Sequence, residues 1–226
     1  LVAPTLPLRR GIARGGARLF FALAGIRFTV HGLERLPDGA CVVVANHASY
    51  LDGVAMQAAL PPRFAFVIKK EMVRVPLASL LLRRLGSEFV DRSNRQAGAS
   101  DTRRVMRRAG SGEALGFFPE GTFTPERGLA KFHAGAFVTA ARAGLPVVPA
   151  VILGTRSILP AERALPRPGR IEIREAHDRA SADIDEVRGL LHLPKQRAVE
   201  HPRTIGRMRR GDDDEIARRQ EFIEPG

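Results

Sequence analysis

The sequence predicts a single α/β domain in which a mixed, mostly buried β-sheet is flanked by helices. Three observations lead to this fold class. Short apolar runs of strand length alternate along the chain with stretches of helical periodicity. The 226 residues suffice for one sizeable core, and no linker divides them into two halves. Alternation of strands and helices is typical of domains whose sheet is largely covered by helices.

The N-terminal segment, residues 1–27, predicts a short amphipathic helix at 12–26. Its apolar stretch lies between Arg18 and Arg27 and is much shorter than the roughly 18 to 20 residues that span a bilayer. Such a helix lies on a membrane surface or packs on the domain. We therefore expect a cytoplasmic protein that is peripheral to the inner face of the cell membrane, with no signal peptide. The chain begins with Leu1 rather than methionine, which leaves open a preceding segment with a deeper anchor.

The central segment, residues 28–193, is the expected core domain. Its first strand is the apolar run CVVVA at 41–45, and a helix follows at 53–60 after a turn. A strand at 64–68 then leads to a helix at 76–85, which Pro76 opens and Gly86 closes. The remaining elements follow from their apolar spacing: a strand at 88–90, a helix at 97–109, a strand at 114–118 ended by Pro119, a helix at 134–143, strands at 147–153 and 171–173, and a helix at 183–192.

The last segment, residues 194–226, differs from the rest. It contains the stretch RRGDDDEIARRQ, whose charges neutralise one another, and few large apolar residues. This composition predicts a disordered or partner-dependent extension without chemistry of its own.

The formal net charge of +12 comes mostly from arginine. It predicts a partner that carries phosphates, and nucleic acid, an anionic membrane and a phosphorylated metabolite all qualify. No aromatic residues are interleaved with the basic clusters for stacking on bases, so nucleic acid is not the expected partner. The single cysteine, Cys41, lies in an apolar run, which excludes a disulfide framework and indicates a small core residue.

The stretch NHASYLD, residues 46–52, places a histidine and an aspartate where an apolar strand ends. A carboxylate bonded to the second ring nitrogen fixes the tautomer of a histidine that acts as a general base. Residues five apart do not meet on a continuous helix or strand. A strand, a turn and a helix starting near Asp52 would bring them together, so His47 and Asp52 are a candidate dyad. A helix-capping Asp52 beside an incidental His47 remains the alternative.

Two further stretches carry polar groups at the ends of expected strands. In GFFPEGT, the turn at Glu120, Gly121 and Thr122 can hold a polar ligand, although an ordinary strand exit explains it equally well. Lys131 follows just before an expected helix whose N–H groups suit a phosphate.

In the other stretch, Lys70 follows one strand and Arg92 ends the next. The guanidinium of Arg92 suits a phosphate, or it forms a surface ion pair with Asp91 or Glu88. Ser49 is too close to His47 in sequence to be its nucleophile. The other histidines show no metal-ligand spacing, so no metal is expected.

Together these stretches resemble the glycerolipid acyltransferase family, which includes bacterial 1-acyl-sn-glycerol-3-phosphate acyltransferases. That family has four sequence blocks, and all four are found here in order, within about residues 28–175. The blocks are HASYLD, then KKEMVRVPLASLLLRRLGSEFVDR, then FPEGT followed by KFHAGA, and finally LPVVPAVILGT. The resemblance implies a glycerol-3-phosphate acyltransferase-like fold.

The resemblance also implies a reaction. His47 would act as general base on a glycerol hydroxyl and Asp52 would orient it, while the acyl donor is a thioester of coenzyme A or acyl carrier protein. The phosphorylated acceptor, a lysophospholipid, would be held by Arg92, Glu120, Gly121 and Thr122, with weaker contributions from Lys70 and Lys131. No cofactor is implied beyond the acyl-CoA or acyl carrier protein co-substrate. The block around Pro149 would form a pocket wall.

The resemblance thus implies transfer of the acyl group to the free hydroxyl of 1-acyl-glycerol 3-phosphate, which gives phosphatidate, and two alternatives to this reaction remain. One is the same chemistry on another acceptor, such as a lyso-ornithine lipid or glycerol 3-phosphate. The other is a non-catalytic basic protein that binds nucleic acid or an anionic membrane, with salt-sensitive binding and no consumption of thioester.

Overall fold

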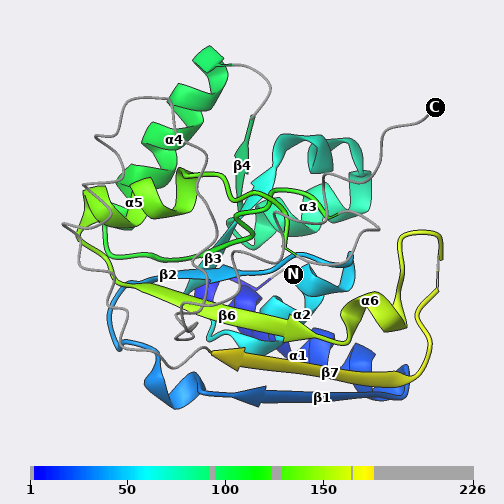
Figure 1. Cartoon of the computed structure of the whole chain (residues 1–226). Helices are drawn as coiled ribbons and strands as arrows, with labels where there is room; N and C mark the ends of the chain where they lie inside the picture. The colour runs from blue at the N-terminus through cyan, green and yellow to red at the C-terminus, as the bar shows by residue number, and fades with distance from the viewer. Residues whose placement is uncertain (1–2, 92–94, 124–128, 164, 176–226) are drawn as a thin grey trace, which may run out of the picture. The chain divides into compact units, whose positions relative to one another are not determined.

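The computed structural model describes residues 3–91, 95–123, 129–163 and 165–175, all of which belong to the compact unit formed by residues 1–192. Seven strands form one sheet in the order β1-β7-β6-β2-β5-β3-β4 (Figure 1). Their bounds are β1 Ile26–His31, β2 Val42–Ala45, β3 Phe64–Lys69, β4 Glu88–Val90, β5 Ala114–Phe117, β6 Val147–Leu153 and β7 Gly169–Glu175.

The sheet is mixed because β6 and β7 run in opposite directions, as Figure 1 shows. On one side of this boundary β6, β2, β5, β3 and β4 are all parallel, and on the other side β1 is parallel to β7. The carboxyl ends of five neighbouring strands therefore meet at one edge of the sheet. In an open α/β sheet this edge is where ligands bind.

Helices and 3-10 turns connect the strands. Their bounds are α1 Leu6–Leu23, η1 Leu33–Arg35, α2 Leu51–Ala59, η2 Lys70–Arg74, α3 Pro76–Arg84, α4 Arg95–Gly110, α5 Gly135–Ala143 and α6 Thr155–Ile158. Side chains from α1, α2 and α6 form the apolar core on one face of the sheet, and side chains from α4 and α5 form a second core on the other face. Figure 1 shows α4 and α5 together, away from α1 and α2.

Strand β5, which lies between β2 and β3, carries Gly116 beside Phe66 of β3. A Cβ at this position would lie 2.8 Å from the ring of Phe66, so only glycine fits without displacing that ring. The close approach lets Phe66 of β3 cover the middle of β5. The sheet can then pack tightly beside the strand ends that carry polar residues.

Helix α1 is attached to the domain by its arginines. Arg14 and Arg18 donate hydrogen bonds to the carbonyls of Ala58 and Ala59, in the last turn of α2, over 2.8 to 3.3 Å. Cations are favourable at a helix carboxyl end, where carbonyl groups lack partners. Arg10 is 3% exposed and pairs with Glu113 at 2.7 Å. These three charges therefore face the domain.

The N-terminal segment differs from its sequence-based prediction. The helix runs from Leu6 to Leu23 rather than over 12–26, and it is followed directly by β1, a strand that the sequence did not predict. The helix ends because Gly25 has a φ of 67°, in the left-handed region. Residues 26–31 then pair with β7 instead of continuing the helix.

The other predicted elements agree with the structure to within about two residues at each end, apart from the short turns η1, η2 and α6, which were not predicted. The expected helix at 183–192 and the segment 194–226 lie outside the described residues. Within the described ranges, α1 to α6 include no helix with the length and apolarity needed to cross a membrane.

Candidate active site

The side chains of His47 and Asp52 meet at the carboxyl end of β2. The strand ends at Ala45 and α2 begins at Leu51, so the residues between them form a turn. In this turn, Nδ1 of His47 lies 2.9 Å from Oδ2 of Asp52. The interruption between strand and helix allows a contact that neither regular element would permit at this spacing.

Asp52 holds the whole turn and not only the imidazole. Its Oδ2 also accepts the backbone N–H groups of Ala48 at 2.5 Å and Ser49 at 2.8 Å. The side chain is fully buried, and Oδ1 has no hydrogen-bond partner in the described part of the chain. Asp52 is not the N-cap of α2, which is Tyr50, and its carboxylate turns back to the preceding loop. Helix capping therefore does not account for this residue.

The turn is fastened to distant parts of the domain by two polar side chains. The amide of Asn46 donates to the carbonyl of Ile152 at 3.0 Å and accepts the N–H of the same residue at 2.7 Å. Ser49 is fully buried, and its hydroxyl donates to the carbonyl of Leu159 at 2.7 Å. Both contacts join residues more than 100 positions apart, and sequence reasoning did not identify either residue as a brace.

Aromatic rings enclose the imidazole of His47. Phe118 stacks on it with a centroid distance of 4.4 Å, and Phe123 meets it edge-on at 4.9 Å. Tyr50 packs in turn against Phe123 at 4.7 Å. The His47 side chain is 18% exposed, and its Nε2 has no hydrogen-bond partner among the described residues. These contacts hold the ring in one orientation.

Glu120, at the end of the neighbouring strand β5, lies next to this turn. Its Oε1 accepts the backbone N–H of His47 at 2.7 Å, and its Oε2 accepts the N–H of Ala130 at 2.7 Å. The residue is 5% exposed. Glu120 therefore joins the His47 turn to the loop after β5, and its expected contact with substrate stays a prediction.

The other residues predicted from this loop lie close by. Gly121 has a φ of 77° and donates its N–H to the carbonyl of Phe118, which makes the turn that follows Glu120. Thr122 and Lys131 are both exposed. The structure brings this turn beside His47, while the ligands of these side chains stay predictions.

Of the second predicted group, Lys70 and Arg92, the structure describes Lys70, which lies two strands away from β2 along the sheet edge. Lys70 follows β3, and its ammonium lies 3.2 Å from Oδ2 of Asp91, which follows β4. Arg92, the strongest candidate for a phosphate contact, lies outside the described residues. Its approach to His47 therefore stays a prediction.

A pocket of about 330 Å³ lies along the same edge, between the loop after β5 and Asp91. Phe118, which stacks on His47, also lines this pocket, so the pocket and the dyad are neighbours. Its walls come from the ends of β3, β4 and β5, from α4 and from the start of α5: Val67, Val90, Asp91, Thr102, Val105, Phe117, Phe118, Pro119, His133, Ala134, Gly135, Ala136 and Thr139. The mixture of apolar and polar walls suits a ligand that has both kinds of group.

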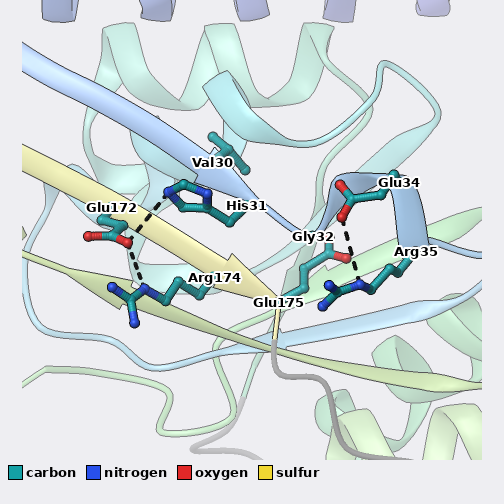
Figure 2. A pocket seen from close by; sticks show the side chains of 8 residues that line it. All are labelled: Val30, His31, Gly32, Glu34, Arg35, Glu172, Arg174 and Glu175. Carbon is teal, nitrogen blue, oxygen red and sulfur yellow. Dashed lines mark hydrogen bonds and ion pairs between the residues drawn. The ribbon is translucent and has the colours of Figure 1, made fainter.

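A second pocket, of about 490 Å³, lies by β1 and β7 and includes no residue of the His47 turn (Figure 2). In Figure 2, Glu172 pairs with His31 and with Arg174, and Glu34 pairs with Arg35.

Glu175, which also lines this second pocket, has no partner for either carboxylate oxygen in the described part of the chain. Burial, reinforced by the charge of Glu34 and opposed by Arg35, raises the pKa of Glu175 to about 7. Among the residues described, no cluster of three or more acidic, histidine or cysteine side chains could hold a metal ion.

Comparison with known proteins gives consistent results. A family model described as "Acyltransferase" matches residues 27–153. A chloroplastic 1-acyl-sn-glycerol-3-phosphate acyltransferase of Brassica napus is 34% identical over 58% of this chain and 38% of its own length. A 1-acyl-sn-glycerol-3-phosphate acyltransferase of Pseudomonas aeruginosa is 28% identical over 89% of this chain and 86% of its own.

The fold also matches a solved structure. The crystal structure of the 1-acyl-sn-glycerophosphate acyltransferase PlsC from Thermotoga maritima superposes with a TM-score of 0.65 at 23% identity, covering 83% of this chain and 81% of that one. The predicted fold class is confirmed by this match. The chain spans less than half the length of the first three curated relatives that it matches, between 38% and 45%.

Proposed function

Because the chain belongs to the acyltransferase family, we propose that it transfers a fatty acyl group from a thioester to the free hydroxyl of 1-acyl-glycerol 3-phosphate, forming phosphatidate. The thioester is that of coenzyme A or of acyl carrier protein. The names of the relatives from Brassica napus and Pseudomonas aeruginosa support this acceptor.

One observation carries the proposal: the 2.9 Å contact between Nδ1 of His47 and Oδ2 of Asp52, with Nε2 left without a partner among the described residues. Asp52 accepts the proton on Nδ1, so the unprotonated nitrogen is Nε2 and can accept a proton from a hydroxyl. The buried carboxylate also stabilises the imidazolium that forms.

The proposed reaction then proceeds in two steps. Nε2 of His47 takes the proton of the acceptor hydroxyl as its oxygen attacks the thioester carbonyl carbon, giving a tetrahedral intermediate. When this intermediate collapses, the carbon–sulfur bond breaks and the leaving thiolate takes the proton from Nε2. The products are the new ester and a free thiol, and the imidazole returns to its neutral state.

Direct transfer without an acyl-enzyme agrees with the state of Ser49 and Cys41. Ser49 is fully buried and its hydroxyl already donates to a carbonyl. Cys41 is also fully buried, and burial raises the pKa of its thiol to about 11. A thiol that stays protonated at neutral pH, and that substrate cannot reach, does not form an acyl-enzyme.

The acceptor phosphate is proposed to lie beside His47 and Asp52, in the direction of the loop after β5 and the end of β4. Arg92 is the main candidate for this contact because a guanidinium can hold a phosphate through two hydrogen bonds. Gly121, Thr122 and Lys131 are proposed to add contacts from the neighbouring loop. Lys70 can contribute only if its ammonium leaves Asp91. Glu120 would act through the position of His47.

The protein is proposed to work in the cytoplasm at the inner face of the cell membrane, attached through α1. Four apolar side chains of this helix are largely exposed, namely Leu8, Ile12, Leu19 and Leu23, at 50%, 50%, 58% and 80%. Their spacing places them along one side of the helix. Because Arg10, Arg14 and Arg18 face the domain, the apolar side chains, and not these arginines, would enter the lipid surface.

The activity can be tested with purified protein, a palmitoyl thioester and a panel of lyso acceptors. We expect free thiol and phosphatidate to appear together when the acceptor is 1-acyl-glycerol 3-phosphate. Running the assay with palmitoyl-CoA and with palmitoyl acyl carrier protein identifies the donor. No thiol release with any acceptor would contradict the proposal and leave a non-catalytic basic protein.

A further inference from the structure

Helix α3 exposes its apolar side chains instead of burying them. It lies in the crossover between the parallel strands β3 and β4, where a helix normally covers one face of the sheet. Yet α3 contains no buried residue. Four large apolar side chains on this helix and just before it are exposed: Val75 by 47%, Leu77 by 84%, Leu80 by 54% and Leu81 by 37%. Leu77, Leu80 and Leu81 have the spacing of one helix face.

Basic residues surround this apolar face. Of the 16 residues from Lys69 to Arg84, five are basic and one, Glu71, is acidic. Arg74 is exposed at the start of α3, while Arg83 and Arg84 are exposed at its end. Apolar side chains framed by cations match the surface of an anionic phospholipid bilayer, where phosphates lie above the acyl chains. A protein partner for this face would need a complementary acidic rim.

The position of α3 relates this surface to the sheet edge that carries His47. The 3-10 turn η2 and the start of α3 follow the carboxyl end of β3, at the same edge of the sheet as His47, and α3 then returns toward the amino end of β4. Attachment through α3 would therefore bring the catalytic edge to the bilayer, where a lysophospholipid acceptor is dissolved.

We propose that the exposed face of α3, formed by Val75, Leu77, Leu80 and Leu81 with Arg74, Arg83 and Arg84, is a second membrane-docking surface that binds anionic phospholipid bilayers. This inference deepens the proposed function and rests on it, because it explains how a membrane-dissolved acceptor reaches His47. It is separate from the attachment through α1, since the two helices use different residues.

The absence of tryptophan from the chain allows a direct test. Leu77→Trp places a single fluorophore at the most exposed position of the face. Leu165→Trp, at a position with 77% exposure in the turn before β7, is the matched control. With vesicles of phosphatidylcholine and phosphatidylglycerol, we expect the emission of Leu77→Trp to shift to shorter wavelength and to be quenched by brominated acyl chains. The control should change little.

Two results from this experiment would overturn the proposal. One is an emission that is unchanged by the vesicles, or that changes equally at both positions. The other is an emission of Leu77→Trp that is already at short wavelength without vesicles, because a second copy or another segment of the chain would then cover α3.

Charge and apolar contacts can be separated by further variants in the full chain. Arg74→Gln and Arg83→Gln should each weaken binding to these vesicles by about fivefold, and the loss should vanish with phosphatidylcholine alone. Leu77→Ser combined with Leu80→Ser should weaken binding by about tenfold or more with both vesicle types. Unchanged binding in all these variants would contradict docking through α3.

The same variants distinguish this proposal from the proposed reaction. If Leu77→Trp enters vesicles but no lyso acceptor yields free thiol, the reaction fails and the docking surface stands. If thiol is released and the fluorophore does not respond, only the docking surface fails. With a short-chain acceptor dissolved as monomers, the Leu77→Ser, Leu80→Ser variant should keep wild-type turnover.

Discussion

The backbone N–H of His47 donates to Oε1 of Glu120 over 2.7 Å, and this bond joins the turn after β2 to the loop after the neighbouring strand β5. The residues are 73 positions apart in sequence. The bond sets the position of the imidazole through its backbone, while Asp52 orients the ring itself. The proposed catalytic geometry thus depends on two buried carboxylates with different tasks.

Replacing Glu120 by glutamine separates these tasks. The amide can still accept the N–H of His47, but its NH₂ group then faces the N–H of Ala130 without a bond. We expect a loss of about 1 to 3 kcal/mol in the free energy of unfolding and a lower kcat. Denaturant unfolding together with the thiol-release assay checks both. Full stability with full activity in Glu120→Gln would show that this brace is dispensable.

Asp52→Asn should slow acyl transfer by a factor of about 10³ or more, because an amide neither fixes the same tautomer nor stabilises the imidazolium. The readout is kcat together with the melting temperature. Asp38→Asn, in the loop before β2, is a suitable control for a change from acid to amide. A lower melting temperature at unchanged kcat in Asp52→Asn would instead assign Asp52 a structural task.

Phe118→Leu should lower kcat by about tenfold, since it removes the ring that stacks on His47 at 4.4 Å and loosens the orientation of the imidazole. The position also lines the pocket of about 330 Å³, so KM for the acceptor is measured as well. Phe132→Leu is the matched control, because Phe132 stacks on Phe137 and not on His47. Equal effects of the two substitutions would argue against a positioning task for Phe118.

Glu175 should make the stability depend on pH in the neutral range. Burial raises its pKa to about 7 in the folded chain, above the ordinary value of 4.5. Between these two pH values the folded state holds a proton that the unfolded state lacks. The stability that the folded state gains by holding this proton is complete below pH 4.5 and is lost as the pH rises through 7.

Glu175→Gln removes this titration. We expect the variant to be more stable than the wild type at pH 8, by about 1 to 3 kcal/mol, and to differ little from it at pH 5. Urea unfolding at the two pH values measures the difference. Glu172→Gln is the control, because arginine neighbours hold the pKa of Glu172 below its ordinary value. A Glu175→Gln variant that is less stable than the wild type at pH 8 would contradict this prediction.

The parts of the fold that local sequence determines were predictable. The strand at 147–153 and the helix bounded by Pro76 and Gly86 follow from periodicity and from residues that start or stop a helix. The contact between His47 and Asp52 was predictable for a similar reason, because the two residues are only five positions apart on either side of a turn. Strand β1 was missed because its first residue, Ile26, continues the apolar run of the preceding helix.

Contacts between distant segments could not be predicted. Asn46 meets Ile152, and Arg10 meets Glu113, only after the sheet has assembled, and neither residue type specifies its partner. The inward orientation of Arg14 and Arg18 depends in the same way on where α2 ends. The sequence leaves open whether this helix lies on a membrane or packs on the domain, and the structure shows these two arginines bound to carbonyl groups of α2.

The most direct test of the central claim is the rate of thiol release from a palmitoyl thioester, with 1-acyl-glycerol 3-phosphate as acceptor, by the wild type and by His47→Ala. The side chain of His47 takes no part in the buried apolar core, so the variant should fold with a similar melting temperature. We expect its turnover to fall by about 10²-fold or more through loss of the general base. A folded His47→Ala variant that keeps most of the wild-type turnover would contradict the account.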